Sequence, residues 1–153
     1  MHRPSLLAAV ATTLILALPA TAIADQPLAP HLSTKPALRT STAELRQGME
    51  EFRAQVLVAQ EQKEQNALDE AGYLRLATEF SDLLTRISTS QDLHSQSDRH
   101  LQWLLGDIAE SIAMMKSSPR LPVKQLSLKR IAETLNLYGR EYDHPGWQPI
   151  LSK

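Results

Sequence analysis

Apolar residues recur at helical spacing in four separate stretches of the chain. In each stretch, five apolar side chains follow one another at alternating steps of four and three residues, which places them along one stripe of an α-helix. The four stripes are Leu45, Met49, Phe52, Val56 and Ala59; Tyr73, Ala77, Phe80, Leu84 and Ile87; Leu101, Leu105, Ile108, Ile112 and Met115; and Leu128, Ile131, Leu135, Tyr138 and Tyr142. The sequence has no alternating pattern long enough for a strand, so it predicts an all-α domain.

Polar residues with capping chemistry precede three of these stripes. Ser41 and Glu44 form a capping-box pattern, in which each side chain bonds to the backbone of the other residue. Asp69 is placed to cap the second helix, and Ser97 or Asp98 the third, because short polar side chains accept hydrogen bonds from the first free N–H groups of a helix. The first helix is therefore predicted to start at Ser41 and the second at Asp69.

Polar runs and prolines predict where the helices end. The first two stripes give way to polar runs at residues 60–66 and 88–97, which we interpret as helix ends and turns. Residues 117–119 close the third helix, and Pro122 is expected to lie before the fourth. The fourth helix is predicted to stop at residues 143–146, because proline restricts the residue before it and cannot continue the hydrogen-bond ladder.

Four helices of similar length, each with one apolar stripe, bury those stripes most economically as a bundle. The sequence therefore predicts an antiparallel up-down-up-down four-helix bundle over residues 41–143. Residues 25–40 contain three prolines and no periodic apolar pattern, and they are expected to form a linker. Residues 144–153 are expected to form a C-terminal tail.

The first 24 residues have the pattern of a signal peptide. Arg3 supplies a positive charge, residues 6–18 are almost wholly apolar, and Ala22 and Ala24 provide small residues before a cleavage site. The apolar run is shorter than the about 20 residues of a membrane span, although an uncleaved anchor is the alternative. We expect Asp25 to begin the mature chain, a periplasmic or secreted location, and no stable membrane span after cleavage.

Composition narrows the range of function classes. The 153 residues include no cysteine, which excludes disulfides, thiolate metal sites and iron–sulfur clusters. The formal net charge is −1, whereas nucleic-acid binders usually carry a basic excess. The catalytic motifs of serine hydrolases, zinc proteases and phosphate-binding loops are also absent from the sequence. The chain is therefore expected to be neither an enzyme nor a nucleic-acid binder.

In the predicted bundle, histidines from distant parts of the chain gather at one end. His94 and His100 flank the connection between the second and third helices, His144 follows the fourth helix, and His31 belongs to the linker. Imidazole binds copper, zinc and nickel, and carboxylates can complete the ligand shell. The sequence thus predicts a divalent transition-metal site formed by His94, His100 and His144. The alternative is that these are ordinary solvated loop histidines, since loops concentrate polar residues.

Two further interpretations concern the same end of the bundle. A haem b site between a methionine early in the first helix and a histidine late in the fourth would use Met49 and His144. The aromatic segment from Tyr138 to Trp147 also has a structural interpretation, in which Trp147 folds back on the bundle end and buries its large ring. We prefer the structural role for this segment.

Two motifs resemble a known group of proteins. Residues 45–49 (LRQGM) and residues 135–140 (LNLYGR) running into residues 143–147 (DHPGW) are similar to small exported proteobacterial proteins, some of them labelled DnrO-like, a name tied to denitrification loci. The resemblance spans the mature domain and implies an exported four-helix protein without an established activity. Members of that group carry a cysteine and a histidine around the connection between helices two and three, whereas this chain has no cysteine.

Together these patterns predict an exported, non-enzymatic binding protein. One hypothesis is a metal-responsive or stress-related accessory protein that uses the histidine-rich end. A second is a structural or protein-interaction module, with a protein partner or a second copy and no small ligand, and a third is a haem b carrier. The ligand, the partner and the oligomeric state are not specified by the sequence.

Overall fold

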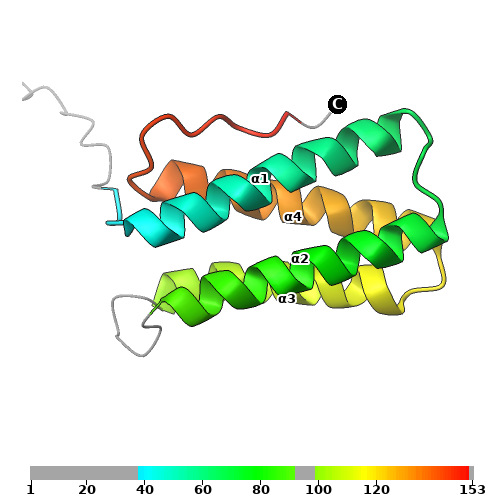
Figure 1. Ribbon diagram of the computed structural model, residues 1–153, viewed down its shortest axis with the longest axis horizontal. Helices are drawn as coiled ribbons and strands as arrows, with labels where there is room; N and C mark the ends of the chain where they lie inside the picture. The colour runs from blue at the N-terminus through cyan, green and yellow to red at the C-terminus, as the bar shows by residue number, and fades with distance from the viewer. Residues whose placement is uncertain (1–37, 92–98, 152–153) are drawn as a thin grey trace, which may run out of the picture. The chain divides into compact units, whose positions relative to one another are not determined.

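The structure is a computed structural model that describes residues 38–91 and 99–151. The chain divides into two units, Met1–Lys35 and Pro36–Lys153, and all described residues belong to the second. The described residues of this unit form four α-helices: α1 (Ala43–Glu64), α2 (Glu70–Ser90), α3 (Arg99–Ser117) and α4 (Leu121–Glu141) (Figure 1). The all-α prediction is therefore confirmed, whereas the predicted signal peptide and most of the predicted linker lie outside the described residues.

Helix α1 starts one residue later than the capping-box pattern predicts. The N-cap is Thr42, whose hydroxyl accepts a hydrogen bond of 3.1 Å from the Leu45 amide, so the prediction of a Ser41 cap was wrong. Ser41 instead donates its hydroxyl to the carbonyl of Asp143, and its own carbonyl accepts from Arg46. A long-range contact of Ser41 has thus replaced the local one. The helix also continues to Glu64, through most of the polar run that we interpreted as its end.

Helix α2 starts where the sequence predicts. Asp69 is the N-cap, and its carboxylate accepts a 2.7 Å hydrogen bond from the Gly72 amide. Helix α4 starts earlier than predicted, at Leu121, so Pro122 lies in its first turn rather than before it. Proline is tolerated there because the first N–H groups of a helix have no partner within the helix.

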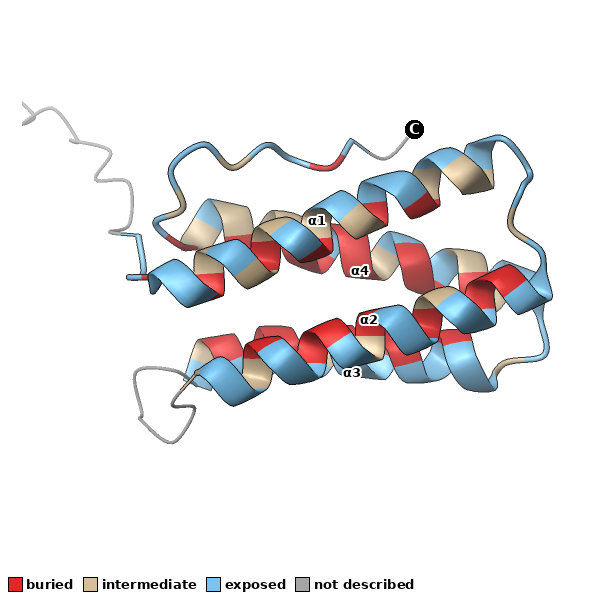
Figure 2. Cartoon of the chain, viewed as in Figure 1, coloured by how far each residue is buried: buried red, intermediate tan, exposed pale blue. Residues whose placement is uncertain are grey.

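The four apolar stripes form one shared core. Helix α1 packs on α2 and α4, and α3 packs on α2 and α4, so each helix contacts two others. Figure 2 shows buried residues on the sides of the helices that face one another and exposed residues on the outer sides. All five predicted stripe positions of every helix are buried. Among the described residues, no helix is both long enough and apolar enough to cross a membrane.

One lysine is part of this interior. Lys124 is 2% exposed, and its ammonium donates a 2.8 Å hydrogen bond to the carbonyl of Met115 in the last turn of α3. The last carbonyls of a helix have no partner within it and carry a partial negative charge, which a cation satisfies. Lys124 therefore stabilises the end of α3 and is not a solvated surface residue.

The chain segments before α1 and after α4 pair with each other and with the helices. The Arg39 amide donates to the Glu141 carbonyl, and the Asp143 amide donates to the Arg39 carbonyl, both at 2.8 Å. Farther along, both ends of the Asn136 amide bond to the Ile150 backbone, at 2.8 and 2.7 Å. Arg53 of α1 also donates to the Gln148 carbonyl. The tail therefore lies against α1 and α4 (Figure 1) and contributes Ile150 to the core.

Candidate functional site

A cluster of aromatic rings surrounds Tyr138 near the end of α4. The Tyr138 side chain is fully buried, and three rings lie within 6 Å of its own. The centroid distances are 4.9 Å to Tyr142, 5.2 Å to Trp147 and 5.7 Å to His144. The cluster therefore holds two phenols, an imidazole and an indole in contact, although these groups differ widely in acidity.

His100 extends this cluster from the first turn of α3. Its ring stacks between Tyr142, at a centroid distance of 6.1 Å, and Trp103, at 5.7 Å. Its Nε2 atom lies beside the Glu141 carboxylate and forms an ion pair with it only when the imidazole is protonated. His100 thus connects the buried tyrosines to Trp103, whose side chain is 55% exposed.

His144 occupies the other side of Tyr138. Its Nδ1 atom lies 3.0 Å from the Tyr138 hydroxyl, and its ring meets Trp147 edge-on at 5.0 Å. Burial lowers the pKa of His144 from the usual 6.5; Glu50 opposes this shift, whereas Arg46 and Arg53 add to it. The lowered pKa means that the imidazole is neutral at pH 7.

The structure places two of the three predicted metal ligands in this cluster. His100 and His144 both belong to it. They do not contact each other directly but are connected through the rings of Tyr142 and Tyr138. His94 and His31 lie outside the described residues. Within the described ranges, no three residues of the types His, Cys, Asp and Glu are grouped as a metal site. The three-histidine site therefore stays a prediction.

The two residues of the predicted haem pair have other surroundings. Met49 is fully buried at its stripe position in the core, and His144 is bonded to Tyr138. The haem interpretation also stays a prediction.

Trp147 folds back on α4, as the sequence predicts. Its ring lies directly over Gly139, where an added Cβ atom would overlap with the indole, and it is partly buried against the core. The Arg53 guanidinium lies 5.7 Å from the centroid of the indole, at the distance of a cation–π contact. Gly139 is therefore required by the close approach of the tail to the helix.

A second feature is a groove between α1 and α2. It has a volume of about 370 Å³ and lies near the connection between the two helices. Its lining consists of Ala54, Gln55, Val58, Gln62, Leu68, Gly72, Arg75, Leu76 and Glu79. Val58 of this lining is 54% exposed. Neither Arg75 nor Glu79 takes part in an ion pair within the described part of the chain.

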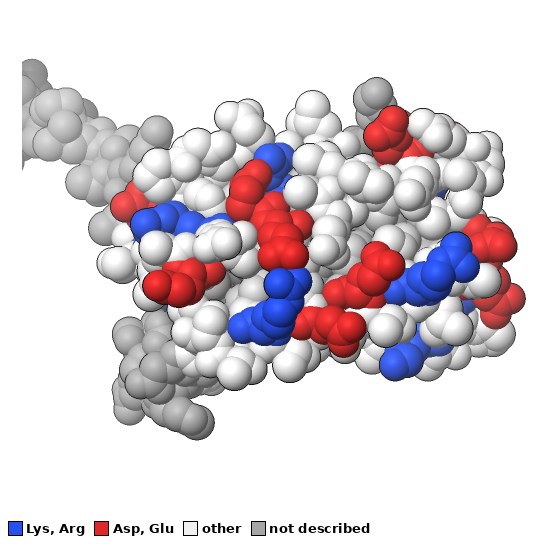
Figure 3. Space-filling view, in the orientation of Figure 1, with Lys and Arg blue, Asp and Glu red and all other residues white. Residues whose placement is uncertain are grey.

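The face that α1 and α2 present is mixed in charge. Figure 3 shows acidic and basic side chains interspersed over it, with uncharged surface between them. One cross-helix ion pair contributes to this pattern, between Arg86 of α2 and Glu51 of α1 at 2.7 Å. The charged side chains of Arg75 and Glu79 are therefore set in a surface without a dominant sign.

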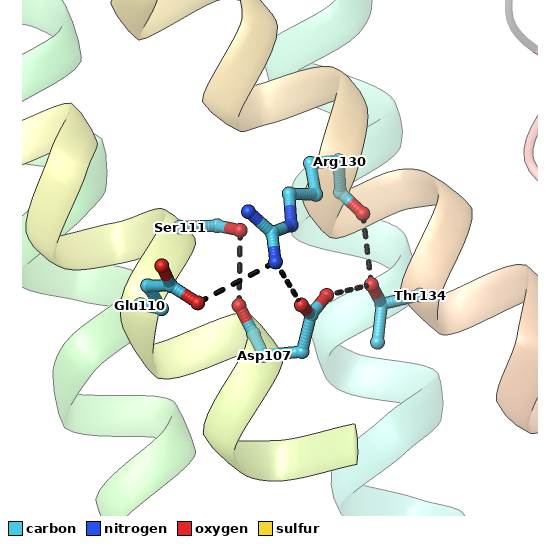
Figure 4. Close-up of polar contacts among 5 residues, drawn as sticks. All are labelled: Asp107, Glu110, Ser111, Arg130 and Thr134. Atoms are coloured by element: carbon cyan, nitrogen blue, oxygen red, sulfur yellow. Dashed lines mark hydrogen bonds and ion pairs between the residues drawn. The ribbon is translucent and has the colours of Figure 1, made fainter. Parts of the chain in front are cut away.

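A third polar cluster joins α3 to α4 (Figure 4). The Asp107 carboxylate accepts from the Arg130 guanidinium and from the Thr134 hydroxyl, the latter at 2.6 Å. Glu110 approaches the same guanidinium at 3.4 Å. Burial raises the pKa of Asp107, but the hydrogen bonds from Arg130 and Thr134 outweigh burial and hold that pKa below its usual 3.8. This cluster is fully explained by its role in holding two helices together.

The lowered pKa of Asp107 predicts a dependence of stability on pH. The contribution is present above the unfolded pKa of 3.8 and is lost as the pH falls through the lower pKa of the folded state. Asp107→Asn should reduce the free energy of unfolding at pH 7 by about 2 kcal/mol and flatten its decline below pH 4. Urea unfolding at several pH values measures both effects. Glu110→Gln is the control, and an equal loss from that exposed residue would contradict the assignment.

Neither the groove nor the pairing of Tyr138 with His144 was predicted from the sequence. The groove depends on how closely two helices approach, which periodicity does not specify. The Tyr138–His144 pair was in principle visible, because both residues flank the predicted stop of the fourth helix.

Known proteins give no further guide to these features. No protein-family model, curated protein or solved structure matches this chain. The resemblance to the DnrO-like group stays a prediction, and the functional argument depends on the geometry of the chain itself.

Proposed function

We propose that this chain is an exported, non-enzymatic binding protein that takes a small amphipathic molecule in the α1–α2 groove. The observation that carries the proposal is a groove of about 370 Å³ that combines aliphatic side chains with a guanidinium and a carboxylate, both outside any ion pair in the described residues. Small-molecule sites have volumes of about 300–1,000 Å³ and are mostly apolar, with a few polar groups that fix orientation.

The lining of the groove suits a ligand with two parts, an apolar body and a polar head group. Val58, Leu68 and Leu76 offer aliphatic surface for an apolar body. Arg75 and Gln62 supply N–H donors, which suit the oxygen atoms of a polar head group. Burial of apolar surface would supply most of the affinity, at about 25 cal/mol per Å², and the donors would fix the orientation of the ligand.

The proposed scaffold is the antiparallel up-down-up-down bundle. Its support is that the starts of α1, α3 and α4 each contact the end of a neighbouring helix. Thr42 bonds to Gln91 at 3.2 Å, His100 pairs with Glu141, and Lys124 bonds to Met115. Short connections such as residues 118–120 favour antiparallel neighbours in bundles. Export to the periplasm is supported by the signal-peptide pattern of residues 1–24.

The amphipathic dye anilinonaphthalene sulfonate tests the proposed groove. We expect the folded protein to bind one dye molecule with a Kd below about 100 μM, because the dye has an apolar body and an anionic head. Val58→Glu should abolish this binding, since it places a carboxylate in the apolar part of the groove. Arg75→Gln should weaken it through loss of the charged donor. Fluorescence titration measures all three.

A matched control distinguishes dye binding in the groove from nonspecific dye binding to exposed apolar side chains. Leu126 of α4 is another exposed aliphatic residue, 60% exposed and outside the groove lining. Leu126→Glu should leave dye binding unchanged. Equal losses in the Val58 and Leu126 variants would contradict the proposal. A third outcome is that the protein forms a dimer that Val58→Glu destabilises and does not bind the dye stoichiometrically. That outcome would instead support a protein-interaction module with a second copy as its partner.

Metal binding at the histidine-rich end is a second proposal. It is supported by the histidine pattern of the sequence; in the structure, the rings of Tyr142 and Tyr138 lie between His100 and His144. Calorimetric titration with Cu²⁺, Zn²⁺ and Ni²⁺ should show a Kd tighter than about 10 μM that weakens in His144→Ala. Absence of such binding, or binding that the substitution leaves intact, would contradict the site.

A further inference from the structure

The chain contains three tyrosines, and two of them are fully buried with different hydrogen bonding. The Tyr138 hydroxyl lies 3.0 Å from the His144 Nδ1 atom. The Tyr73 hydroxyl has no hydrogen-bond partner within the part of the chain that the structure describes. Burial raises the pKa of both phenols, that of Tyr138 to about 12, so both are neutral at pH 7. The two residues therefore differ mainly in whether a base is available for the phenol proton.

We propose that Tyr138 is a redox-active site that gives one electron to a one-electron oxidant and its phenol proton to His144. In this step the O–H bond of Tyr138 breaks and an N–H bond forms at Nδ1 of His144. The products are a neutral tyrosyl radical, an imidazolium and the oxidant reduced by one electron. Addition of an electron from a reductant, with return of the proton, restores the starting pair. The proposal is independent of the groove.

The position of His144 explains why the proton transfer is favoured. Loss of an electron makes a phenol strongly acidic, and a buried phenol cation without a base would carry an uncompensated charge, which is costly in an apolar interior. With the ring proton of His144 on Nε2, the Nδ1 atom at 3.0 Å removes that cost, because the phenol proton moves along the contact between the two atoms. Tyr73 lacks such an acceptor among the described residues and is expected to be the poorer donor.

A path of aromatic rings connects Tyr138 to the surface. From Tyr138 the path passes to Tyr142 at 4.9 Å, to His100 at 6.1 Å and to Trp103 at 5.7 Å between ring centroids. Trp103 is more than half exposed, so an oxidant in solvent can reach its ring. Imidazole is harder to oxidise than indole or phenol, so His100 serves as a bridge for electron transfer and is not itself oxidised. The buried phenol is thereby available to an oxidant that never enters the core.

Charged side chains of α1 surround the acceptor. Glu50, Arg46 and Arg53 face the His144 imidazole, and Tyr138 of α4 is bonded to it.

Photo-oxidation of the purified protein with ruthenium(III) tris-bipyridine, followed by freeze-quench electron paramagnetic resonance, tests the proposal. The protein should give a neutral tyrosyl radical signal. Tyr138→Phe should abolish that signal, whereas Tyr73→Phe, which removes the other fully buried phenol, should leave it. His144→Gln should lose most of the signal although Tyr138 is present. Trp103→Phe should slow its appearance, because the exposed entry point is less easily oxidised.

A radical that persists in Tyr138→Phe would overturn the assignment. An unchanged yield in a folded His144→Gln variant would do the same, and would reduce the Tyr138–His144 contact to a structural one.

Discussion

Gly139→Ala is expected to destabilise the protein by about 2 kcal/mol, within the range for forcing extra atoms into a packed region. Alanine favours a helix over glycine by up to about 1 kcal/mol, so an isolated α4 would be stabilised by this change. In the folded protein, however, the new methyl group would occupy the space of the Trp147 ring. The ring must move away from α4, and its contacts with Tyr138 and His144 are lost. Urea unfolding and tryptophan fluorescence measure the loss of stability and the exposure of the ring.

A double-mutant cycle identifies the cause of that loss. In a Trp147→Ala background the space over Gly139 is empty, so Gly139→Ala should become neutral or stabilising, with the sign given by helix propensity alone. Gly106, a glycine of α3 with no atoms within 4 Å of an added Cβ, is the matched control, and Gly106→Ala should stabilise the otherwise unsubstituted protein. Destabilisation by Gly139→Ala in both backgrounds would show that the indole is not what the methyl group meets.

Ile150→Ala is expected to cost about 3 kcal/mol of stability, the usual size of a large-to-small change at a buried aliphatic position. Ile150 is 2% exposed although it lies only three residues from the C-terminus, and its backbone is held by the Asn136 amide. Thermal or urea unfolding measures the loss. The next residue, Leu151, is 77% exposed, so Leu151→Ala should be neutral. Equal effects of the two substitutions would contradict the packing of the tail against the bundle.

The sequence was sufficient to predict the helices because each of them carries a long and regular apolar stripe. All stripe positions proved to be buried, since a single stripe per helix leaves only one face that can enter a core. Asp69 capped its helix as predicted because its chemistry is local and nothing competes for the side chain. Trp147 folded back as predicted because a ring of that size next to a helix stop has few other ways to leave water.

Predictions failed where a long-range contact replaced a local one. Ser41 has the residue type of a helix cap, but its hydroxyl bonds to Asp143, about a hundred positions away, and Thr42 caps the helix in its place. Lys124 resembles a solvated surface lysine until α3 places an unsatisfied carbonyl beside it. Such contacts depend on which helix ends meet in space, and hydrophobic periodicity carries no information about that.

The candidate sites were likewise predicted only in part from the sequence. The sequence drew attention to His100 and His144 because histidines are few, and both belong to one cluster in the structure. It did not reveal that Tyr138 separates them and bonds to one of them. The groove between α1 and α2 is made mostly of residues that are unremarkable in type, and it exists only because two helices leave space between their side chains at one place.

An NMR titration of the purified protein with anilinonaphthalene sulfonate, following backbone amide shifts, tests the proposed binding function most directly. The groove predicts saturable shifts confined to residues 54–62 of α1 and residues 68–79 at the start of α2, with α3 and α4 unaffected. Shifts that appear mainly on α3 and α4, or no saturable shifts at all, would contradict the proposal.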